Sequence, residues 1–168
     1  MPYFRDVPDI VEPVSPIADG PKPTLVEDSM LEIAFVVGQA LKLARTQSVA
    51  ILVPDRRYLN RITPQFNRGF NLDREIKTWK PQQGIQYYGT YHSAKGLEFD
   101  TVILPFCNDR VLPDPEAVKA FGETDAMAQA GRLLYVGVTR ARTRLIITYS
   151  GEITKLLPTD PNLYEKVL

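Results

Sequence analysis

The sequence predicts an α/β protein in which a parallel sheet carries helices on both faces. Three short apolar runs predict strands that are buried on both sides: residues 49–53 (VAILV), 101–105 (TVILP) and 145–150 (LIITYS). Strands that alternate with helical segments are typical of a parallel sheet. The chain has 168 residues, of which 44% are hydrophobic and 24% charged, so we expect one globular domain with an ordinary core.

The first part of the chain is divided by its proline content. Prolines recur through residues 1–21, which are expected to form an extended lead-in, whereas residues 22–168 are expected to form the folded domain. Residues 23–27 (PTLVE) predict a short strand. A helix should follow, started by a capping box in which Ser29 precedes Glu32 by three positions. Its apolar periodicity predicts a core-facing side made of Met30, Ile33, Ala34, Val37, Leu41 and Ala44.

The remaining elements follow in order. The strand at 49–53 is ended by Pro54 and Asp55, and residues 56–66 predict a helix up to Pro64. Residues 85–93 have strand composition, and residues 124–142 predict a long helix before the last strand. Parallel sheets bind ligands beyond the carboxyl ends of their strands. The turn at Ala94–Gly96 follows a predicted strand, so we expect it at that edge.

Charge and cysteine content limit the classes of protein. The net charge is zero, which argues against indiscriminate binding to polyanions. Residues 55–80 nevertheless carry seven basic and three acidic side chains, a surface that could face phosphate but is more simply a solvated helical surface. The single cysteine, Cys107, excludes a disulfide framework. With no signal peptide and no apolar run near about 18 residues, we expect a cytoplasmic location and no membrane partner.

Residues 91–100 (YHSAKGLEFD) gather unusual chemistry around one glycine. Gly96 can adopt positive φ or let a ligand approach the backbone. Lys95 is a point charge suited to phosphate, and Glu98 can accept hydrogen bonds from a sugar hydroxyl. His92 is the only histidine of the chain and a poor metal ligand by itself, so no metal site is expected. Each of these residues alone is more simply explained by a plain connection between strands with solvated charges.

A second cluster, residues 132–144 (RLLYVGVTRARTR), carries four arginines at positions 132, 140, 142 and 144. Arg140 lies near the end of the predicted helix. It can satisfy the last helix carbonyls, or it can stabilise charge on a phosphoryl group held by a neighbouring domain. Composition does not separate these two interpretations.

Together, TYHSAKGLEFDTVILP and RLLYVGVTRAR resemble motifs V and VI of the superfamily 1 helicases of the UvrD/Rep type. The resemblance extends over about residues 22–150, nearly all of a second RecA-like domain. It implies a RecA-like, P-loop NTPase-type fold without a P-loop of its own. It also implies that Arg140 is the arginine finger, that Gly96 and Glu98 lie against the nucleotide with Glu98 on the ribose, and that Lys95 lies near the phosphates or the strand. Thr90 and His92 would approach single-stranded DNA.

The resemblance implies a shared site. ATP and Mg²⁺ would be held mainly by a preceding RecA-like domain, because the 168 residues contain no G-x-x-x-x-G-K-[ST] loop. The chain alone should therefore be inactive, as a part of a longer ATP-dependent DNA helicase. Motif IV of the family has an arginine where Pro54 stands here, so Arg56 or Arg57 would have to substitute. The short gap between motifs IV and V implies a compact, helicase-IV-like relative, and RNA polymerase is an alternative partner.

Overall fold

The computed structural model describes residues 22–27, 32–66, 69–74, 80–158 and 160–167. The predicted lead-in at 1–21 lies outside these residues. Ser29 and Met30, from the predicted start of the first helix, also lie outside them. In the described part, seven parallel strands form one sheet in the order β3-β4-β2-β5-β6-β1-β7. They are β1 (Thr24–Glu27), β2 (Val49–Val53), β3 (Phe70–Asn71), β4 (Gln86–Thr90), β5 (Phe99–Leu104), β6 (Ala141–Tyr149) and β7 (Glu165–Val167).

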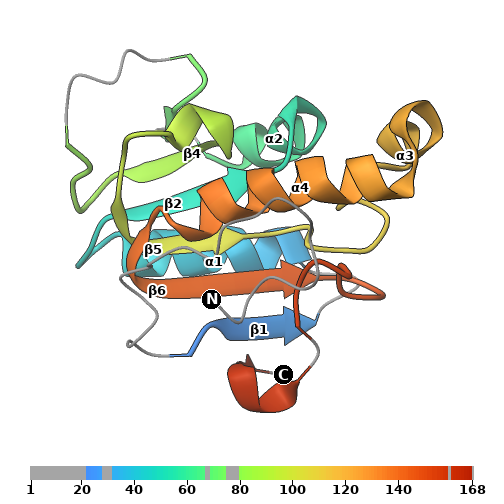
Figure 1. Ribbon diagram of the computed structural model, residues 1–168. Helices are drawn as coiled ribbons and strands as arrows, with labels where there is room; N and C mark the ends of the chain where they lie inside the picture. Colours follow the sequence, from blue (N-terminus) through green and yellow to red (C-terminus); the bar gives the residue numbers. More distant parts are fainter. Residues whose placement is uncertain (1–21, 28–31, 67–68, 75–79, 159, 168) are drawn as a thin grey trace.

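Helices cover both faces of the sheet, as the sequence predicts (Figure 1). The helices are α1 (Glu32–Leu43), α2 (Arg56–Ile62), α3 (Pro115–Phe121) and α4 (Glu123–Val138). Alternate residues of β2 enter two separate clusters: Ile51 packs with α1 and α2, whereas Leu52 packs with α4. All five residues of β2 are buried, because a central parallel strand is covered on both sides.

The long helix ends earlier than predicted, at Val138 instead of residue 142. The Thr139 hydroxyl donates to the carbonyls of Tyr135 and Val136, at 2.9 and 3.1 Å, and closes the last turn. Ala141 then pairs with Phe99, so β6 begins four positions before the predicted strand at 145. The apolar spacing that continues through Ala141 is shared by helix and strand, which is why periodicity alone misplaces this boundary.

The predicted core face of α1 is partly wrong. Ala44 is buried as predicted, and Ile33 and Val37 pack against the core, whereas Ala34 and Leu41 are exposed. Val36 and Ala40, which were not predicted, are buried. Apolar residues occur on almost every side of this helix, so its hydrophobic periodicity does not define one face. Small residues at positions 40 and 44 let α1 lie close to the sheet.

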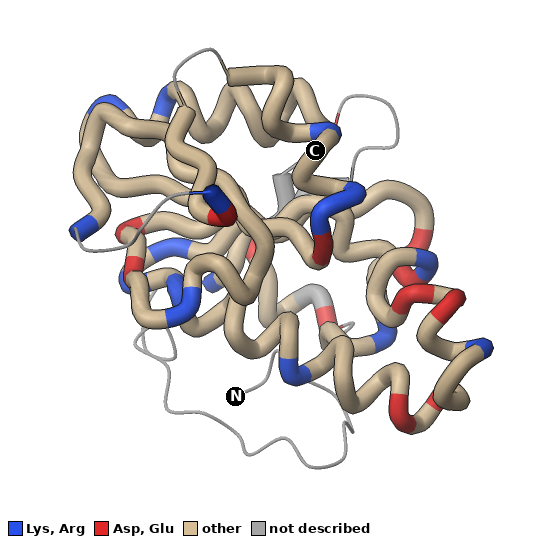
Figure 2. The backbone as a smooth tube through the Cα atoms, turned by 90° about the horizontal axis from the view of Figure 1, so that it is seen from above, with Lys and Arg blue, Asp and Glu red and all other residues tan. Residues whose placement is uncertain are grey.

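Helix α3 was not predicted, although its start carries recognisable signals. The Asp114 carboxylate accepts a hydrogen bond from the Glu116 amide at 3.0 Å, and Pro115 occupies the first helical position. The helix ends at Gly122, where φ is +85°. Acidic residues outnumber basic ones in this part of the chain, at the end of the molecule on the right of Figure 2.

Residues 91–98 cross one face of the sheet from edge to edge. Thr90 ends β4 level with Val53, and residue 99 begins β5 beside Ala141. Strand pairing places these two levels about 20 Å apart at 3.3 Å per residue. Gly96 therefore lies at the amino edge of the sheet, not at the carboxyl edge where the sequence analysis placed the turn. The connection between two parallel strands must run back from the carboxyl end of the first to the amino end of the second. Here it reaches the amino edge before residue 96.

No helix in the described ranges is long and apolar enough to cross a membrane.

Candidate functional site

A cleft at the amino edge of the sheet brings together residues from both motifs. It has a volume of about 600 Å³ and is named here the amino-edge cleft. Its lining residues are Lys80, Pro81, Gly96, Leu97, Glu98, Arg140 and Arg142. Glu98 directly precedes β5 and Arg140 directly precedes β6, and these strands are neighbours in the sheet. Residues 42 positions apart in the sequence thus share one opening.

Arg140 is fixed by neutral acceptors. Its backbone carbonyl accepts from the Phe99 amide at 2.8 Å, which ties the end of α4 to the start of β5. Its guanidinium donates from Nε to Val136 O at 3.2 Å, from Nη1 to Leu97 O at 3.3 Å and from Nη2 to Thr139 Oγ at 3.2 Å. No carboxylate in the described residues forms an ion pair with it. A guanidinium has five N–H donors, so the group caps α4 and still offers uncompensated charge and free donors to an anion.

Gly96 and Glu98 also line the amino-edge cleft. Gly96 has φ +87°, a left-handed conformation that a side chain would strain, and this turn presents the next two residues to the cleft. Glu98 is exposed and forms no ion pair with the residues that the structure describes. The cleft therefore combines a carboxylate and a guanidinium that form no ion pair with the described residues, a pattern suited to a ligand with hydroxyl groups at one end and negative charge at the other.

Two further cations in this cleft were not among the predicted site residues. Arg142 lies two positions after Arg140, at the start of β6, and lines the same cleft. Its Nη2 lies 3.7 Å from Asp100 Oδ1, an exposed and weak ion pair. Lys80 enters from the loop before β4. The arginine cluster in the sequence pointed to Arg142, whereas nothing in the sequence near Lys80 connects it with residues 140–142.

A second cleft, at the carboxyl edge, contains the residues expected to meet nucleic acid. This carboxyl-edge cleft has a volume of about 430 Å³ and is lined by Pro54, Asp55, Arg56, Asp73, Thr90, His92 and Ser93. His92 is exposed, at the start of a 3-10 turn (His92–Ala94). Lys95 is also exposed but lines neither cleft. The predicted site residues thus separate into two groups on opposite edges.

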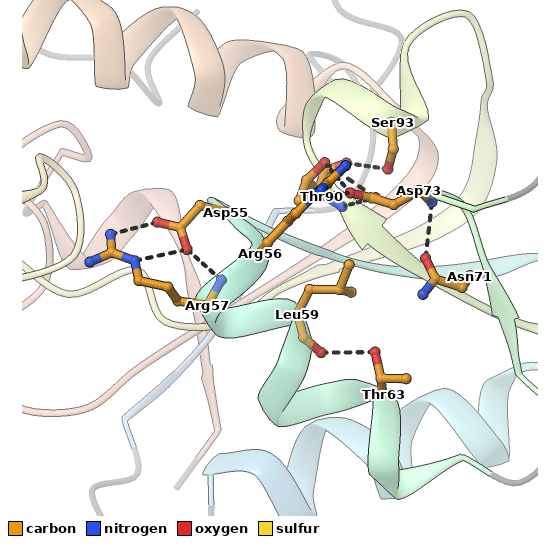
Figure 3. Close-up of polar contacts among 9 residues, drawn as sticks. All are labelled: Asp55, Arg56, Arg57, Leu59, Thr63, Asn71, Asp73, Thr90 and Ser93. Carbon is orange, nitrogen blue, oxygen red and sulfur yellow. Dashed lines mark hydrogen bonds and ion pairs between the residues drawn. The ribbon is translucent and has the colours of Figure 1, made fainter.

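Asp73 organises the carboxyl-edge cleft (Figure 3). Its carboxylate accepts from the Thr90 amide at 2.9 Å and from the Thr90 hydroxyl at 3.2 and 3.3 Å. It also lies 3.8 Å from Arg56 Nε. The Asp73 side chain is 11% exposed and that of Arg56 is 82% exposed, so the buried carboxylate orients a guanidinium that faces solvent. No sequence signal marked Asp73.

Neither Arg56 nor Arg57 lines the amino-edge cleft. Both follow β2 at the carboxyl edge, about 20 Å of strand away from Arg140. Arg57 donates from Nη2 to Asp55 at 2.7 Å and to Asp114 at 2.6 Å, which joins α2 to the start of α3. Hydrogen bonds to Asp55, and then to Asp114, raise the Arg57 pKa above its ordinary value.

Within the described ranges, no group of three or more His, Cys, Asp or Glu residues is arranged to hold a metal ion.

Comparison with known proteins finds a match for the segment that contains the amino-edge cleft and part of the carboxyl-edge cleft. Residues 73–152 match the family of the UvrD-like helicase C-terminal domain. This segment is similar to that family and is named here the UvrD-like domain. Thr90, His92, Gly96, Glu98 and Arg140 all lie within the matched segment of the UvrD-like helicase C-terminal domain.

Curated relatives of the UvrD-like domain are named as DNA helicases. A probable DNA helicase II homolog of Rickettsia conorii is 43% identical over 61 residues, which are 36% of this chain and 9% of the relative. The DNA helicase Rep of Buchnera aphidicola from Acyrthosiphon pisum is 34% identical over 86 residues, which are 48% of this chain and 13% of that protein. The matched segments thus span about a tenth of these relatives.

A solved structure shares the fold of the UvrD-like domain. It is the C-terminal domain of a possible DNA helicase from Lactobacillus plantarum WCFS1, with a TM-score of 0.61 and 22% identity. The similarity covers 88% of this chain and 86% of the other. It confirms the RecA-like α/β fold predicted from the motifs.

Proposed function

We propose that residues 22–168 form the second RecA-like motor domain of a UvrD/Rep-type ATP-dependent DNA helicase, and that Arg140 is its arginine finger. The observation that carries the proposal is the amino-edge cleft, in which Arg140, Glu98 and Gly96 meet although they come from separate motifs. Its free guanidinium and free carboxylate match the two ends of a nucleoside triphosphate.

The cleft fits one side of a nucleotide. Arg140 would stabilise negative charge that develops on the transferring phosphoryl group, and Glu98 would accept hydrogen bonds from the ribose. Lys95 is exposed beside Gly96 and would act on phosphate only through long-range charge. ATP supplies the phosphoanhydride bond whose cleavage drives the motor. The residues of this chain would bind and orient the nucleotide and compensate its negative charge.

The groups that bind the other side of the nucleotide must come from another domain. The 168 residues contain no phosphate loop, so no backbone cradle for the triphosphate and no loop Ser or Thr for Mg²⁺ are present. A preceding RecA-like domain of the same enzyme would hold both. We therefore expect the 168-residue chain to show no ATPase activity and weak affinity for nucleotides.

The carboxyl-edge cleft would face single-stranded DNA. Thr90 and His92 are the predicted contacts, and Arg56 adds an exposed guanidinium beside them. The Thr90 hydroxyl and amide are engaged by Asp73, so His92 and Arg56 are the groups with donors available to a phosphate.

The arginine finger is tested in the complete enzyme, with its phosphate-loop domain. We expect Arg140→Ala to lower the ATPase turnover by about 10³-fold or more, because an arginine finger contributes about 10³–10⁵ in turnover. Nucleotide affinity, measured by fluorescence of a labelled analogue, should change little. Steady-state phosphate release gives the turnover.

The matched control is Arg110→Ala, which removes an exposed arginine far from the cleft, after β5. Its turnover should equal that of the unchanged enzyme. Near-normal turnover in Arg140→Ala would refute the finger assignment, and ATP hydrolysis by the 168-residue chain alone would refute the shared site.

The molecule that stimulates the ATPase activity distinguishes a DNA translocase from an ATPase that acts on RNA polymerase. We expect single-stranded DNA to raise the ATPase of the complete enzyme and RNA polymerase to leave it unchanged. Stimulation by the polymerase alone would favour the second function.

A further inference from the structure

A third groove adjoins the carboxyl-edge cleft at His92. It has a volume of about 350 Å³ and is lined by His92, Gln129, Arg132, Leu133 and Val136; it is named here the α4 groove. His92 lines both the α4 groove and the carboxyl-edge cleft, so one exposed imidazole separates the two hollows. The groove was not anticipated from the sequence.

Four of its five lining residues come from one side of α4. Positions 129, 132, 133 and 136 follow the i, i+3, i+4, i+7 spacing of a single helical face. Gln129 and Arg132 are exposed, whereas Leu133 and Val136 are half-buried and form an apolar floor. The face therefore combines a cation, an amide and an apolar surface.

The charge of the groove favours an anionic ligand. None of its lining residues is a carboxylate, and Arg132 forms no ion pair with the described residues. On the other side of His92, Arg56 is also exposed. Two outward guanidiniums thus flank one imidazole, with an apolar floor beside it.

We propose that the α4 groove is a nucleobase subsite, in which a base of single-stranded nucleic acid lies on Leu133 and Val136 while Arg132 contacts its phosphate. His92 stacks between this base and the neighbouring nucleotide in the carboxyl-edge cleft. Unstacked bases are bound by aromatic side chains, including histidine, together with arginine. The Gln129 amide can donate to or accept from the edge of the base. The proposal rests on the proposed function in one respect, namely that the carboxyl edge meets nucleic acid.

The test uses the 168-residue chain and fluorescein-labelled dT12, with fluorescence anisotropy at several salt concentrations. Arg132→Ala should weaken binding about 5- to 10-fold and reduce the slope of log K against log[salt] by about 0.7, because one phosphate contact on a single strand is lost. Arg132 is exposed, so the variant should fold normally, which circular dichroism checks. Arg45→Ala, an exposed arginine after α1, is the control and should bind like the unchanged chain.

Two further measurements separate a base from a phosphate. The ring protons of His92 give the only histidine signals in the NMR spectrum, and dT12 should shift them. A strand of the same length with abasic sites should bind several-fold more weakly and shift the ring signals less, because it lacks a base to stack on His92.

Equal binding of dT12 and the abasic strand, an unchanged salt slope in Arg132→Ala, or no binding of dT12 would each overturn the subsite. Capture of a protein by this face with no effect of dT12 would assign the groove to that partner instead. These outcomes leave the Arg140 experiment untouched, since turnover in the complete enzyme tests the opposite edge of the sheet.

Discussion

At the scale of single residues, Gly96 shows how backbone conformation constrains the candidate site. Its φ of +87° is left-handed, and no atom lies within 4 Å of the position that a Cβ would occupy. An added side chain there would meet no steric obstacle, so its cost would be conformational only. Of the two roles expected for this glycine, positive φ is confirmed.

We expect Gly96→Ala to lower the free energy of unfolding by about 1 kcal/mol, from the strain of a left-handed alanine. Gly38→Ala is the matched control. Gly38 lies within α1, also with no atom within 4 Å of its Cβ position, so that change should raise stability by about 0.5–1 kcal/mol. Urea unfolding of both variants gives the comparison. Equal effects in the two variants would show that conformation at Gly96 is not restrictive.

Arg140 illustrates what residue patterns leave open. The sequence allowed either a cap for the helix carbonyls or a charge held toward a nucleotide. Its contacts with Val136 O and Leu97 O show that it caps α4, and the absence of a carboxylate partner in the described residues leaves its charge available. The two roles are compatible because five N–H groups exceed what the cap requires.

At the scale of elements, Glu32 joins the start of α1 to the ends of two strands. Its Oε2 accepts from the Phe106 amide at 2.9 Å and from the Thr148 hydroxyl at 2.6 Å. Phe106 has φ +63°, which is unfavourable for a residue with a side chain, and this hydrogen bond holds its backbone in place. Glu32 is 7% exposed, and Phe106 and Thr148 are buried, so water cannot replace the carboxylate as an acceptor for their hydrogen bonds.

We expect Glu32→Ala to reduce the free energy of unfolding by about 2–4 kcal/mol, because two buried donors lose their acceptor. Glu32→Gln keeps an oxygen at the same distance from the backbone and should cost less than half as much. Thermal and urea unfolding measure both changes. An equal loss in Glu32→Gln and Glu32→Ala would show that the negative charge, not the acceptor geometry, stabilises the junction.

The strands were predicted better than the helices for a physical reason. A strand buried on both faces, such as β2, must be apolar at every position, and that run is visible in the sequence. The face of α1 was mispredicted because nearly all its sides are apolar. Helix α3 begins with Asp114 and Pro115, which also suit a turn, so its seven residues gave no decisive pattern.

At the scale of the whole molecule, the sheet order decides which site residues meet. The motifs predicted Gly96, Glu98 and Arg140 as one group, and the structure brings them together. Sequence spacing could not show that Thr90 and His92 lie at the other edge, because this depends on the path of residues 91–98. Lys80 and Asp73 escaped prediction for the same reason: only folding brings them to their clefts.

Burial of ionisable groups in the core predicts a loss of stability in alkaline solution. Burial raises the pKa of the Tyr91 phenol well above its ordinary value of 10.0, and burial followed by the charge of Glu32 raises the pKa of the Cys107 thiol above 9.0. Above these ordinary values the unfolded chain releases protons that the folded chain retains. The free energy of unfolding should therefore fall as the pH rises above about 9, by up to about 1.4 kcal/mol per pH unit for each group.

Urea unfolding between pH 7 and 11 measures this slope. Cys107→Ala and Tyr91→Phe should each flatten it, whatever they do to stability at pH 7. Cys107 is the only cysteine, so its variant isolates the thiol contribution. Unchanged slopes in both variants would show that other groups cause the alkaline loss.

The path of residues 91–98 has a mechanical consequence. These eight residues cross about 20 Å of sheet height, and eight fully extended residues reach about 28 Å at most. A 3-10 turn at His92–Ala94 shortens the run further, and the Tyr91 ring packs against Gly137. The segment is short for the distance that it spans, so we expect a displacement of the backbone at Glu98 to be passed in part to His92. If the amino-edge cleft binds a nucleotide and the carboxyl-edge cleft binds single-stranded DNA, as proposed, one movement of this segment would alter both sites together.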